Sequence, residues 1–469
     1  MPVYRHRSEL PVSAPEAFAW HRQTRAFERL VPPWQPMRIV ATVPPDGAPA
    51  PGTRRVLSVR AGPLRLRWET VYGAMEPGRL FTNEQVRGPF ARWEHTHRFL
   101  PRGDFACVLE DAVDFRLPFW PLGPLLGTAA TGRWLERLFR LRHARTAHDL
   151  ERHARYRGHA PLTVAVSGAS GLIGTRLCAF LASGGLRVLQ LVRRAPRGPH
   201  EIAWNPAAGT MDAAALEGVD AVVHLAGANL AAGRWTAARK RELWASRVES
   251  TALLARTLAG LAHKPRAFVV GSAIGYYGDS GDAPVDESAP RGTGFLAELC
   301  EAWEAAAQPA REAGIRTVHV RTGLVLAGEG GVLARLAPIF ALGLGGPLGS
   351  GRQPMSWIAL EDLLTVFQRA LYEDAWAGPV NAVAPEAPDN REFTRALARV
   401  LRRPAPFRVP ALAIRLGLGQ LGREALLAGQ RVVPARLQAL GFHWRLPRLE
   451  DALAEELGRE APASKASRR

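Results

Sequence analysis

The chain has 469 residues, of which 47% are hydrophobic and 22% charged, a composition typical of a soluble globular protein of two or three domains. The formal net charge of +18 comes mostly from arginines dispersed along the chain, and without a basic stripe and stacking aromatics it does not indicate a nucleic-acid partner. No apolar run approaches the roughly 18 residues that span a bilayer, so we expect no stable membrane insertion. The N-terminus lacks the apolar core of a signal peptide, and the three cysteines are widely spaced. We therefore expect a cytoplasmic protein.

Residues 1–156 form the first predicted domain, an antiparallel sheet followed by one long helix. Apolar and polar residues alternate roughly every second position in four strand-like runs, "MRIVATV", "TRRVLSVRAG", "LRLRWETVYGAM" and "ARWEHTHRFLP". Apolar residues then recur at helical spacing in "GRWLERLFRLRHARTAHDLERHARY", which gives one apolar stripe. We expect this helix to pack on the sheet.

The last of these runs places His95 and His97 on one face of a strand. Imidazoles on one face could begin a metal site, but a structural or catalytic site needs at least a third protein ligand. No third ligand is evident nearby, so we expect no metal, and we interpret the two histidines as polar groups of a surface or pocket.

The pattern changes after a linker at 157–161. Residues 162–380 alternate apolar strands with helical stretches, which predicts a parallel sheet covered on both faces. Residues 381–459 are more helical and are interrupted by prolines, and 460–469 are expected to be a frayed tail. The predicted fold class of this second part is α/β, a Rossmann-like parallel sheet with a helical C-terminal lobe.

Three glycines lie between the first strand of this region and its first helix, in "SGASGLIG". In a strand–turn–helix setting, Gly168 would make a tight turn, Gly171 would let the backbone approach a pyrophosphate, and Gly174 would allow close packing of helix on strand. The pyrophosphate would then lie on the positive N-terminus of the helix. This spacing predicts a dinucleotide site.

The second strand of the region ends in "LQLVRRAP". A site for NAD normally has an acidic residue here for the ribose hydroxyls, whereas arginine accommodates the 2′-phosphate of NADP. Arg193 and Arg194 therefore favour NADP, although arginines are frequent throughout this chain and NAD stays open.

The order of several motifs resembles the extended short-chain dehydrogenase/reductase superfamily, of the nucleotide-sugar epimerase type. The glycine triplet is followed by "VVHLAGA", "SRVESTALL", "VVGSAIGYYGD" and "VDESAP". A closer resemblance, to an atypical epimerase family of unassigned substrate with its own C-terminal domain, rests on "RWTAARKRELWASRV", "GFLAELCEAWE", "GLGGPLGSGRQPMSWIALEDL" and "GQRVVPARLQALGFHWRLPRLEDAL".

The resemblance implies a set of cofactor-binding and catalytic residues. It places a catalytic hydroxyl at Ser272. It also matches Tyr277 to the tyrosine of a Tyr-Gly pair that follows this hydroxyl in the family. It also implies that the adenosine and ribose pass the end of the third strand, and that the 2′-phosphate contacts Arg193. The implied cofactor residues are Gly168, Ser170, Gly171, Leu172, Ile173, Gly174, Arg193, Arg194, His224, Leu225, Ala226 and Gly227.

The chain departs from the superfamily at its acid–base pair. The usual Tyr-x-x-x-Lys lowers the pKa of the tyrosine so that it exchanges a proton with the substrate hydroxyl, but no tyrosine here is followed by lysine at that spacing. In "GFLAELCEAWE" the two places fall on Phe295 and Leu299, or in a shifted register on Leu296 and Cys300. The candidates for a replacement acid or base are Tyr277, Glu298, Cys300 and Glu304. Each of them is also explained as a residue of the core or of a helix surface.

Polar residues of the C-terminal half are expected to form a substrate wall. They are Arg321 after the sixth strand and, in a glycine-rich loop, Arg352, Gln353 and Trp357. Arginine and glutamine give directional hydrogen bonds and tryptophan gives a stacking face. Other side chains that could reach the same cleft or only cap a helix are Arg234, Trp235, Arg239, Lys240 and Arg247.

The N-terminal region is similar to the polyketide cyclase/START-like (SRPBCC) superfamily. The similarity rests on "SELPVSAPEAFAWH", "LVPPW" and the closing helix, and it implies an α+β helix-grip domain around an apolar cavity for a hydrophobic small molecule. Two functions remain open. One is an NADP-dependent oxidoreductase or epimerase-like enzyme, and the other is a non-catalytic, NADP(H)-responsive ligand-binding or regulatory protein. The oligomeric state is open as well.

Overall fold

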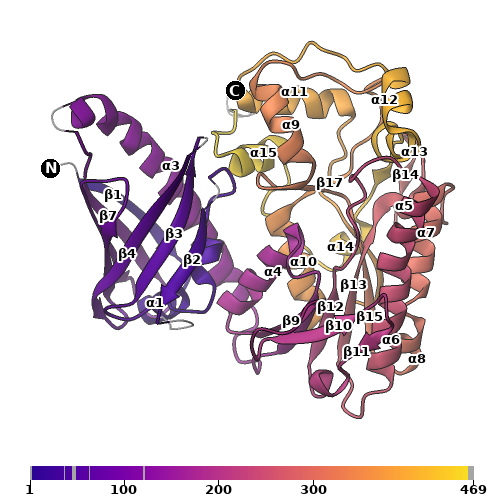
Figure 1. Cartoon of the computed structure of the whole chain (residues 1–469), viewed down its shortest axis with the longest axis horizontal. Coiled ribbons are helices and arrows are strands. Elements are labelled where there is room, and N and C mark those ends of the chain that lie inside the picture. The colour runs from indigo at the N-terminus through magenta and orange to yellow at the C-terminus, as the bar shows by residue number, and fades with distance from the viewer. Residues whose placement is uncertain (1–2, 36, 45–48, 63, 120–121, 463–469) are drawn as a thin grey trace. The chain divides into compact units, whose positions relative to one another are not determined.

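The structure is a computed structural model of the chain (Figure 1), and it describes residues 3–35, 37–44, 49–62, 64–119 and 122–462. The chain divides into two compact units. The first comprises 1–160 with 179–186, and the second comprises 161–178 with 187–469. Most of the expected tail at 460–469 lies outside the described residues. No described helix is both long enough and apolar enough to cross a membrane.

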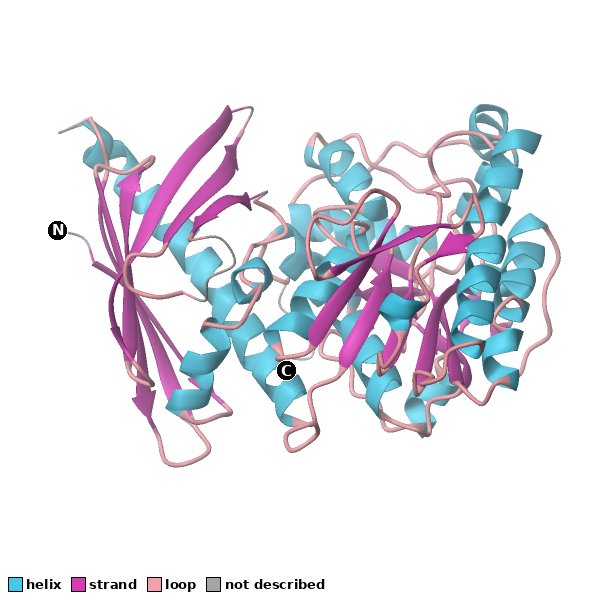
Figure 2. Ribbon diagram, turned by 60° about the horizontal axis from the view of Figure 1, so that its bottom comes forward, coloured by secondary structure: helices cyan, strands magenta, loops and turns pink. Residues whose placement is uncertain are grey.

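The first unit is a seven-stranded antiparallel sheet in the order β1-β7-β6-β5-β4-β3-β2, with one long helix lying along it (Figure 2). The four strand-like runs in the sequence correspond to β2, β3, β4 and β6, and β1, β5 and β7 complete the sheet. This is the arrangement expected for a helix-grip domain. Its elements are β1 (Val3–Leu10), α1 (Ala14–His21), α2 (Ala26–Arg29), β2 (Met37–Val43), β3 (Arg54–Ala61), β4 (Leu64–Glu76), β5 (Leu80–Arg87), β6 (Arg92–Pro101), β7 (Cys107–Arg116) and α3 (Leu122–Ala154).

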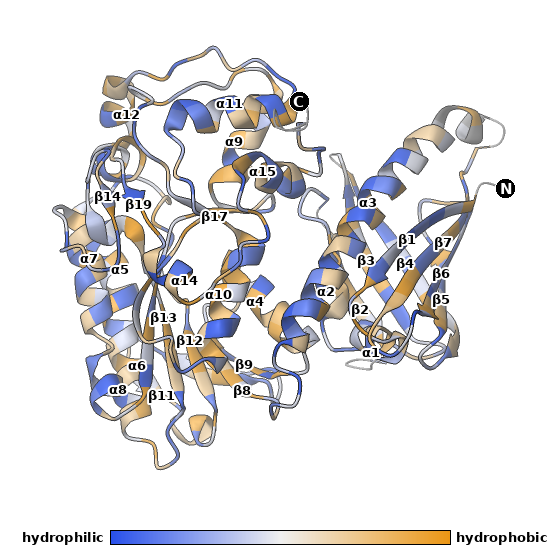
Figure 3. Cartoon of the chain, turned by 180° about the vertical axis from the view of Figure 1, so that it is seen from behind, coloured by the Kyte–Doolittle hydropathy of each residue, from blue (hydrophilic) through white to orange (hydrophobic). Residues whose placement is uncertain are grey.

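Local sequence explains how this unit begins and closes. Ser13 caps α1, because its hydroxyl accepts a hydrogen bond from the backbone N–H of Glu16, and Pro15 occupies the first turn, where its missing N–H costs nothing. Along α3 hydrophobic and hydrophilic residues alternate (Figure 3), and Leu135 and Phe139 are buried in a cluster that includes Trp93 of the sheet.

The second unit is built on an eight-stranded sheet in the order β11-β10-β9-β8-β12-β13-β15-β18. The strands from β10 to β18 run parallel and β11 pairs antiparallel with β10. The strand order reverses between β8 and β12, and ligands bind at such a switch point in open parallel sheets. The strands are β8 (Thr163–Ser167), β9 (Arg187–Val192), β10 (Glu201–Asn205), β11 (Thr210–Met211), β12 (Ala221–His224), β13 (Ala267–Ala273), β15 (Arg316–Thr322) and β18 (Gly378–Ala382).

Helices cover both faces of this sheet. Figure 1 shows α4 and α10 on one side of the strands and α6 and α8 on the other. The helices up to residue 372 are α4 (Leu172–Ser183), η1 (Ala214–Leu216), α5 (Ala237–Trp244), the π-helix η2 (Ala245–Glu249), α6 (Ser250–Ala259), η3 (Ile274–Tyr277), α7 (Phe295–Ala305), α8 (Gln308–Glu312), α9 (Gly331–Ala341) and α10 (Leu360–Tyr372).

The C-terminal residues form the expected helical lobe. Asp389 and Glu392 make a reciprocal capping box at the start of α11, and α9, α11 and α15 share one apolar cluster. Two small parallel pairs, β14 with β19 and β16 with β17, connect distant segments. The remaining elements are β14 (Pro284–Val285), β16 (Leu324–Leu326), β17 (Trp357–Ala359), α11 (Asn390–Leu401), α12 (Ala411–Leu418), α13 (Gln420–Gly422), η4 (Arg423–Leu427), β19 (Arg431–Val432), α14 (Ala435–Ala439) and α15 (Leu449–Leu457).

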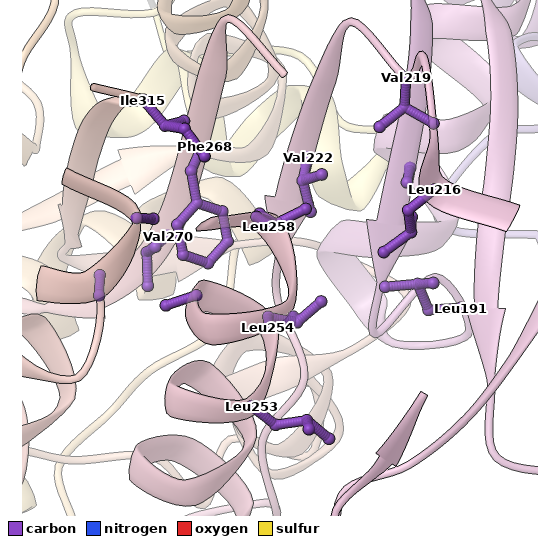
Figure 4. Close-up of a cluster of buried hydrophobic side chains, with 14 of the residues drawn as sticks. Leu191, Leu216, Val219, Val222, Leu253, Leu254, Leu258, Phe268, Val270 and Ile315 are labelled. Carbon is purple, nitrogen blue, oxygen red and sulfur yellow. The ribbon is translucent and has the colours of Figure 1, made fainter. Parts of the chain in front are cut away.

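A buried cluster joins the central strands to α6. In Figure 4, Leu254 and Leu258 of α6 lie beside Phe268 of β13 and Val222 of β12. All four side chains are fully buried. The cluster holds β12 and β13 at fixed positions, and the carboxyl ends of these strands carry candidate site residues.

Replacement of Phe268 by alanine tests this core. Because Phe268 is 0% exposed, Phe268→Ala removes buried contacts and leaves a cavity, and it should lower the free energy of unfolding of the second unit by about 3–5 kcal/mol. Phe407→Ala is the matched control, since Phe407 is 56% exposed, and should change it by less than about 0.5 kcal/mol. Urea unfolding measures both. Equal effects of the two substitutions would contradict the assigned core.

Candidate active site

The three glycines after β8 have three different surroundings. Gly168 has φ +68°, and a Cβ there would lie 2.6 Å from the carbonyl of Leu225. A Cβ on Gly174 would lie 2.2 Å from the carbonyl oxygen of Gly168. Gly171 is exposed, and its Cβ would meet only that same oxygen, at 3.2 Å. Close packing therefore requires glycine at 168 and 174, whereas Gly171 lies at an exposed surface of the loop.

This open surface lies at the start of α4. Leu172 and Ile173 begin the helix, and Ser170 and Gly171 precede it as exposed residues. The first N–H groups of a helix have no partners within it, and the helix dipole is positive there. The loop thus offers what a pyrophosphate requires.

The two arginines after β9 differ in their contacts. Arg194 forms a bidentate ion pair with Glu201, with Nη1 to Oε2 at 2.7 Å. This contact raises the pKa of Arg194, through the hydrogen bond to Glu201. Arg193 is exposed and has no ion pair or side-chain hydrogen bond within the described part of the chain. Of the two, Arg193 is the one that can bind a phosphate without losing a partner.

The end of β12 is held against the glycine loop by Ser167. The Ser167 hydroxyl contacts His224 Nδ1 at 2.6 Å and accepts hydrogen bonds from the backbone N–H groups of Leu225 and Ala226. His224 Nε2 lies 3.1 Å from the hydroxyl of Ser250, and burial lowers the pKa of His224 to about 3. His224 is thus a neutral, buried residue that connects the two strands, and the backbone of Leu225 and Ala226 lies against the loop.

Arg247 lies beside Gly227, where a Cβ would be 3.1 Å from its guanidinium carbon. The side chain donates to the carbonyl of Ala228 at 3.0 Å and lies over the ring of Trp303. Its place in the π-helix η2 is notable because such irregular turns are frequent at functional sites. Arg247 is a candidate site residue by position.

A chain of hydrogen bonds starts at Ser272, in β13. Its hydroxyl donates to Glu304 Oε1 at 2.7 Å, and Arg321 donates through Nε and Nη2 to both oxygens of Glu304 at 2.8 Å. Arg321 Nη1 reaches the hydroxyl of Tyr277 at 3.0 Å, which donates to Asn381 Oδ1 at 2.7 Å. Four elements, β13, α7, β15 and η3, thus meet β18 in one polar network.

Burial within this network determines the state of Tyr277. Burial raises the pKa of Tyr277 to about 12, although Arg321 and Asn381 act in the opposite direction. Its hydroxyl is protonated at neutral pH and both of its hydrogen bonds are to protein groups. An acid–base role for Tyr277 stays a prediction.

The other candidate acids and bases differ in exposure and in their contact with Ser272. Glu298 is exposed on α7. Cys300 is buried, and burial raises the pKa of its thiol to about 12, so it is not ionised at neutral pH. Of the candidates on α7, Glu304 is the one in contact with Ser272.

The residues expected to form a substrate wall lie in different environments. Arg321 is buried in the network above. Gln353 donates to the carbonyls of Leu348 and Leu426, and Trp357 is fully buried in the apolar cluster of the C-terminal lobe. Arg352 is exposed. The substrate role of these residues stays a prediction, with Arg352 as its exposed member.

Asn381 is the network residue that sequence reasoning did not single out. Its backbone N–H donates to Glu287 and its side-chain amide to the carbonyl of Val433. Asn381 lies in β18, a short strand within a stretch expected to be mainly helical. Only the pairing of Asn381 with Arg321 across β15 and β18 reveals its place.

The parallel sheet with its switch point, the glycine loop and the hydroxyl at the end of β13 define an extended short-chain dehydrogenase/reductase. Residues 164–382 match the NAD dependent epimerase/dehydratase family, residues 10–133 match polyketide cyclase/dehydrase and lipid transport proteins, and residues 409–456 match a domain of unknown function. The chain belongs to the NAD dependent epimerase/dehydratase family, with a polyketide cyclase-like domain before it.

Relatives and solved structures agree with this assignment. An epimerase family protein of Mycobacterium tuberculosis is 45% identical over 296 residues, which are 63% of this chain and 97% of the relative. The structure of a nucleoside-diphosphate sugar epimerase from Corynebacterium glutamicum is 32% identical, with a TM-score of 0.79, and the match covers 100% of this chain and 92% of that one.

A further solved structure bears on the cofactor. Human epimerase family protein SDR39U1, isoform 2, was solved with NADPH. It is 35% identical to this chain, with a TM-score of 0.58, over 63% of this chain and 99% of the human one. Together with the glycine loop, this makes the cofactor of the family fold NAD(P), as expected from the sequence.

Alanine substitutions in the glycine loop separate cofactor binding from folding. Gly171→Ala should weaken NADPH binding at least tenfold, because its side chain would occupy the surface that a pyrophosphate approaches. It should cost less stability than Gly174→Ala, because its Cβ would lie 3.2 Å rather than 2.2 Å from the Gly168 carbonyl oxygen. Gly174→Ala should instead lower the thermal midpoint, because its Cβ would overlap the Gly168 carbonyl. Fluorescence titration with NADPH and a thermal melt measure the two effects. Unchanged NADPH affinity in Gly171→Ala would place the pyrophosphate elsewhere.

Proposed function

We propose that the chain is an NADP-dependent oxidoreductase or epimerase-type enzyme in which Ser272 and Glu304 replace the usual tyrosine and lysine. The observation that carries this proposal is the 2.7 Å hydrogen bond from Ser272 to Glu304. It lies at the carboxyl end of β13, the strand next to the one whose end faces the glycine loop. This is the edge of the sheet where parallel α/β folds bind their ligands.

The preference for NADP over NAD rests on Arg193. It follows the second strand, is exposed and has no partner among the described residues, whereas Arg194 is held by Glu201. The position lacks the acidic side chain that would bind the ribose hydroxyls of NAD. A guanidinium can bind a 2′-phosphate through two parallel hydrogen bonds.

The proton chemistry follows from the donors in the network. When bound, the nicotinamide supplies or accepts a hydride. Ser272 already donates its own hydrogen to Glu304, so its lone pairs are available to accept the proton of a substrate hydroxyl. Glu304 would receive the proton through Ser272, while Arg321 fixes both carboxylate oxygens. Tyr277 and Asn381 act as positioning residues, because they hold Arg321.

A second candidate function is a non-catalytic NADP(H)-responsive binding protein. The observation that favours it is the buried, neutral thiol of Cys300 at the place of the usual lysine in the shifted register, with Leu296 at the place of the tyrosine. A protein with these residues keeps the cofactor fold without the usual relay. Catalytic turnover distinguishes the two functions.

The first unit is proposed to bind a small hydrophobic molecule. A cavity of about 80 Å³ between its sheet and helices has a largely aromatic wall, with Trp68, Tyr72, Phe81 and Trp93 among its lining residues. Apolar cavities with a few polar groups are typical of small-molecule sites.

Cofactor choice tests the role of Arg193. Arg193→Asp should lower NADPH affinity at least tenfold and raise NADH affinity, because a carboxylate repels the 2′-phosphate and accepts hydrogen bonds from the ribose hydroxyls. Arg194→Gln is the matched control and should leave the preference unchanged. Titration of each variant with both nucleotides gives the ratio of affinities. A wild-type ratio in Arg193→Asp would exclude this residue from the site.

The proton relay is tested by turnover. With NADPH and a panel of hydrophobic ketones and nucleotide sugars followed at 340 nm, we expect oxidation by the wild-type chain. We also expect a loss of kcat of about 10²-fold or more in Ser272→Ala and Glu304→Gln, at unchanged NADPH affinity. Glu298→Gln, on the exposed face of the same helix, should retain wild-type activity. NADPH binding without turnover across the panel would favour the binding-protein function.

A further inference from the structure

The first unit contains a second cluster of chemically active side chains, far along the sequence from the nucleotide loop. His95 and His97 come from β6, Asp111 from β7 and His143 from α3, and all four are buried. His97 and Asp111 are direct cross-strand neighbours, and His95 is on the same face of β6 two residues before. The sheet thus supplies the third ligand that is not evident beside the two histidines in the sequence.

The donor atoms of this cluster converge on Asp111. His95 Nε2 lies 2.8 Å and His97 Nδ1 lies 2.6 Å from Asp111 Oδ1. His143 Nε2 lies 2.5 Å from the other oxygen, Oδ2. One ligand atom from each of His95, His97 and Asp111 lies within 4.8 Å of the others.

His97 approaches Asp111 closely but without the alignment of a regular hydrogen bond. Its Nδ1 is buried 2.6 Å from Asp111 Oδ1 and is not aligned with that oxygen. Two buried ligand atoms that lie side by side in this way are arranged like neighbours around a common ion. Tetrahedral bonds of about 2.0–2.1 Å to zinc separate such atoms by about 3.4 Å, so shifts of under about 1 Å would admit the ion.

The cluster also borders the cavity of the first unit. His95, His97 and His21 line it, together with the aromatic wall and the side chains of Arg55 and Arg142. His21 has its Nδ1 bonded to the carbonyl of Ala17 at 2.8 Å, which orients the ring. An ion held by His95, His97 and Asp111 would therefore be on the cavity wall, with coordination positions open toward a ligand.

We propose that His95, His97 and Asp111 bind one divalent first-row transition-metal ion of the zinc class, with His143 holding the second oxygen of Asp111 from behind. Two imidazoles and one carboxylate are a donor set typical of such ions, and a hydrogen-bonded outer partner like His143 orients a ligating carboxylate. The open positions accept an oxygen atom of the small molecule in the cavity.

Metal uptake by the full-length, tag-free chain tests this site. After dialysis against EDTA, we expect Co²⁺ to bind at about one equivalent per chain with visible d–d absorption, and Zn²⁺ to displace it. His97→Asn and Asp111→Asn should each weaken Co²⁺ binding at least tenfold. His200→Asn is the matched control, because His200 is exposed and lies outside the cluster, and it should bind Co²⁺ like the wild type.

NADPH titration and circular dichroism of the same samples show whether each variant is folded, and NADPH affinity should not change. Failure of the wild-type chain to take up Co²⁺ or Zn²⁺ would overturn the proposal, whatever the variants do. Uptake that is equal in wild type and in a folded His97→Asn or Asp111→Asn chain would also overturn it. The histidines would then serve only to stabilise the buried carboxylate.

Discussion

The close contact between the backbone at Gly168 and the carbonyl of Leu225 is the constraint on which the proposed nucleotide site depends. β8 and β12 are neighbours in the sheet, and their carboxyl ends can meet only if no side chain separates them. Glycine at 168 permits this contact, and glycine at 174 lets α4 begin directly on the same turn. Gly171 then faces outward, with the helix N-terminus behind it.

The chemistry built on this frame differs from that of the wider superfamily. The sequence lacks the usual tyrosine and lysine, whose places fall on Phe295 and Leu299 or, in a shifted register, on Leu296 and Cys300. The polar groups near the sheet edge are joined through the ion pair between Arg321 and Glu304. Breaking a buried pair of this kind is costly because it leaves an unpaired charge. The network therefore holds Ser272 in one position, as its proposed role in proton transfer requires.

Much of the second unit could be predicted from sequence because its signals are local. Strands and glycines are close in the chain, and the proposal for Arg193 uses only the spacing within a single βαβ unit. Residues whose partners depend on strand pairing could not be predicted. Asp111 joins His97 only through the register of β6 and β7, and Asn381 joins Arg321 only through β18. The burial of Trp357 likewise depends on how the C-terminal lobe packs.

The glycine loop and Arg193 together are proposed to select NADP(H). The most direct measurement is calorimetric titration of the wild-type chain with NADPH and with NADH under identical conditions. We predict one NADPH site per chain with affinity at least tenfold higher than for NADH. Equal affinities, or tighter binding of NADH, would contradict a role of Arg193 in selecting NADP(H).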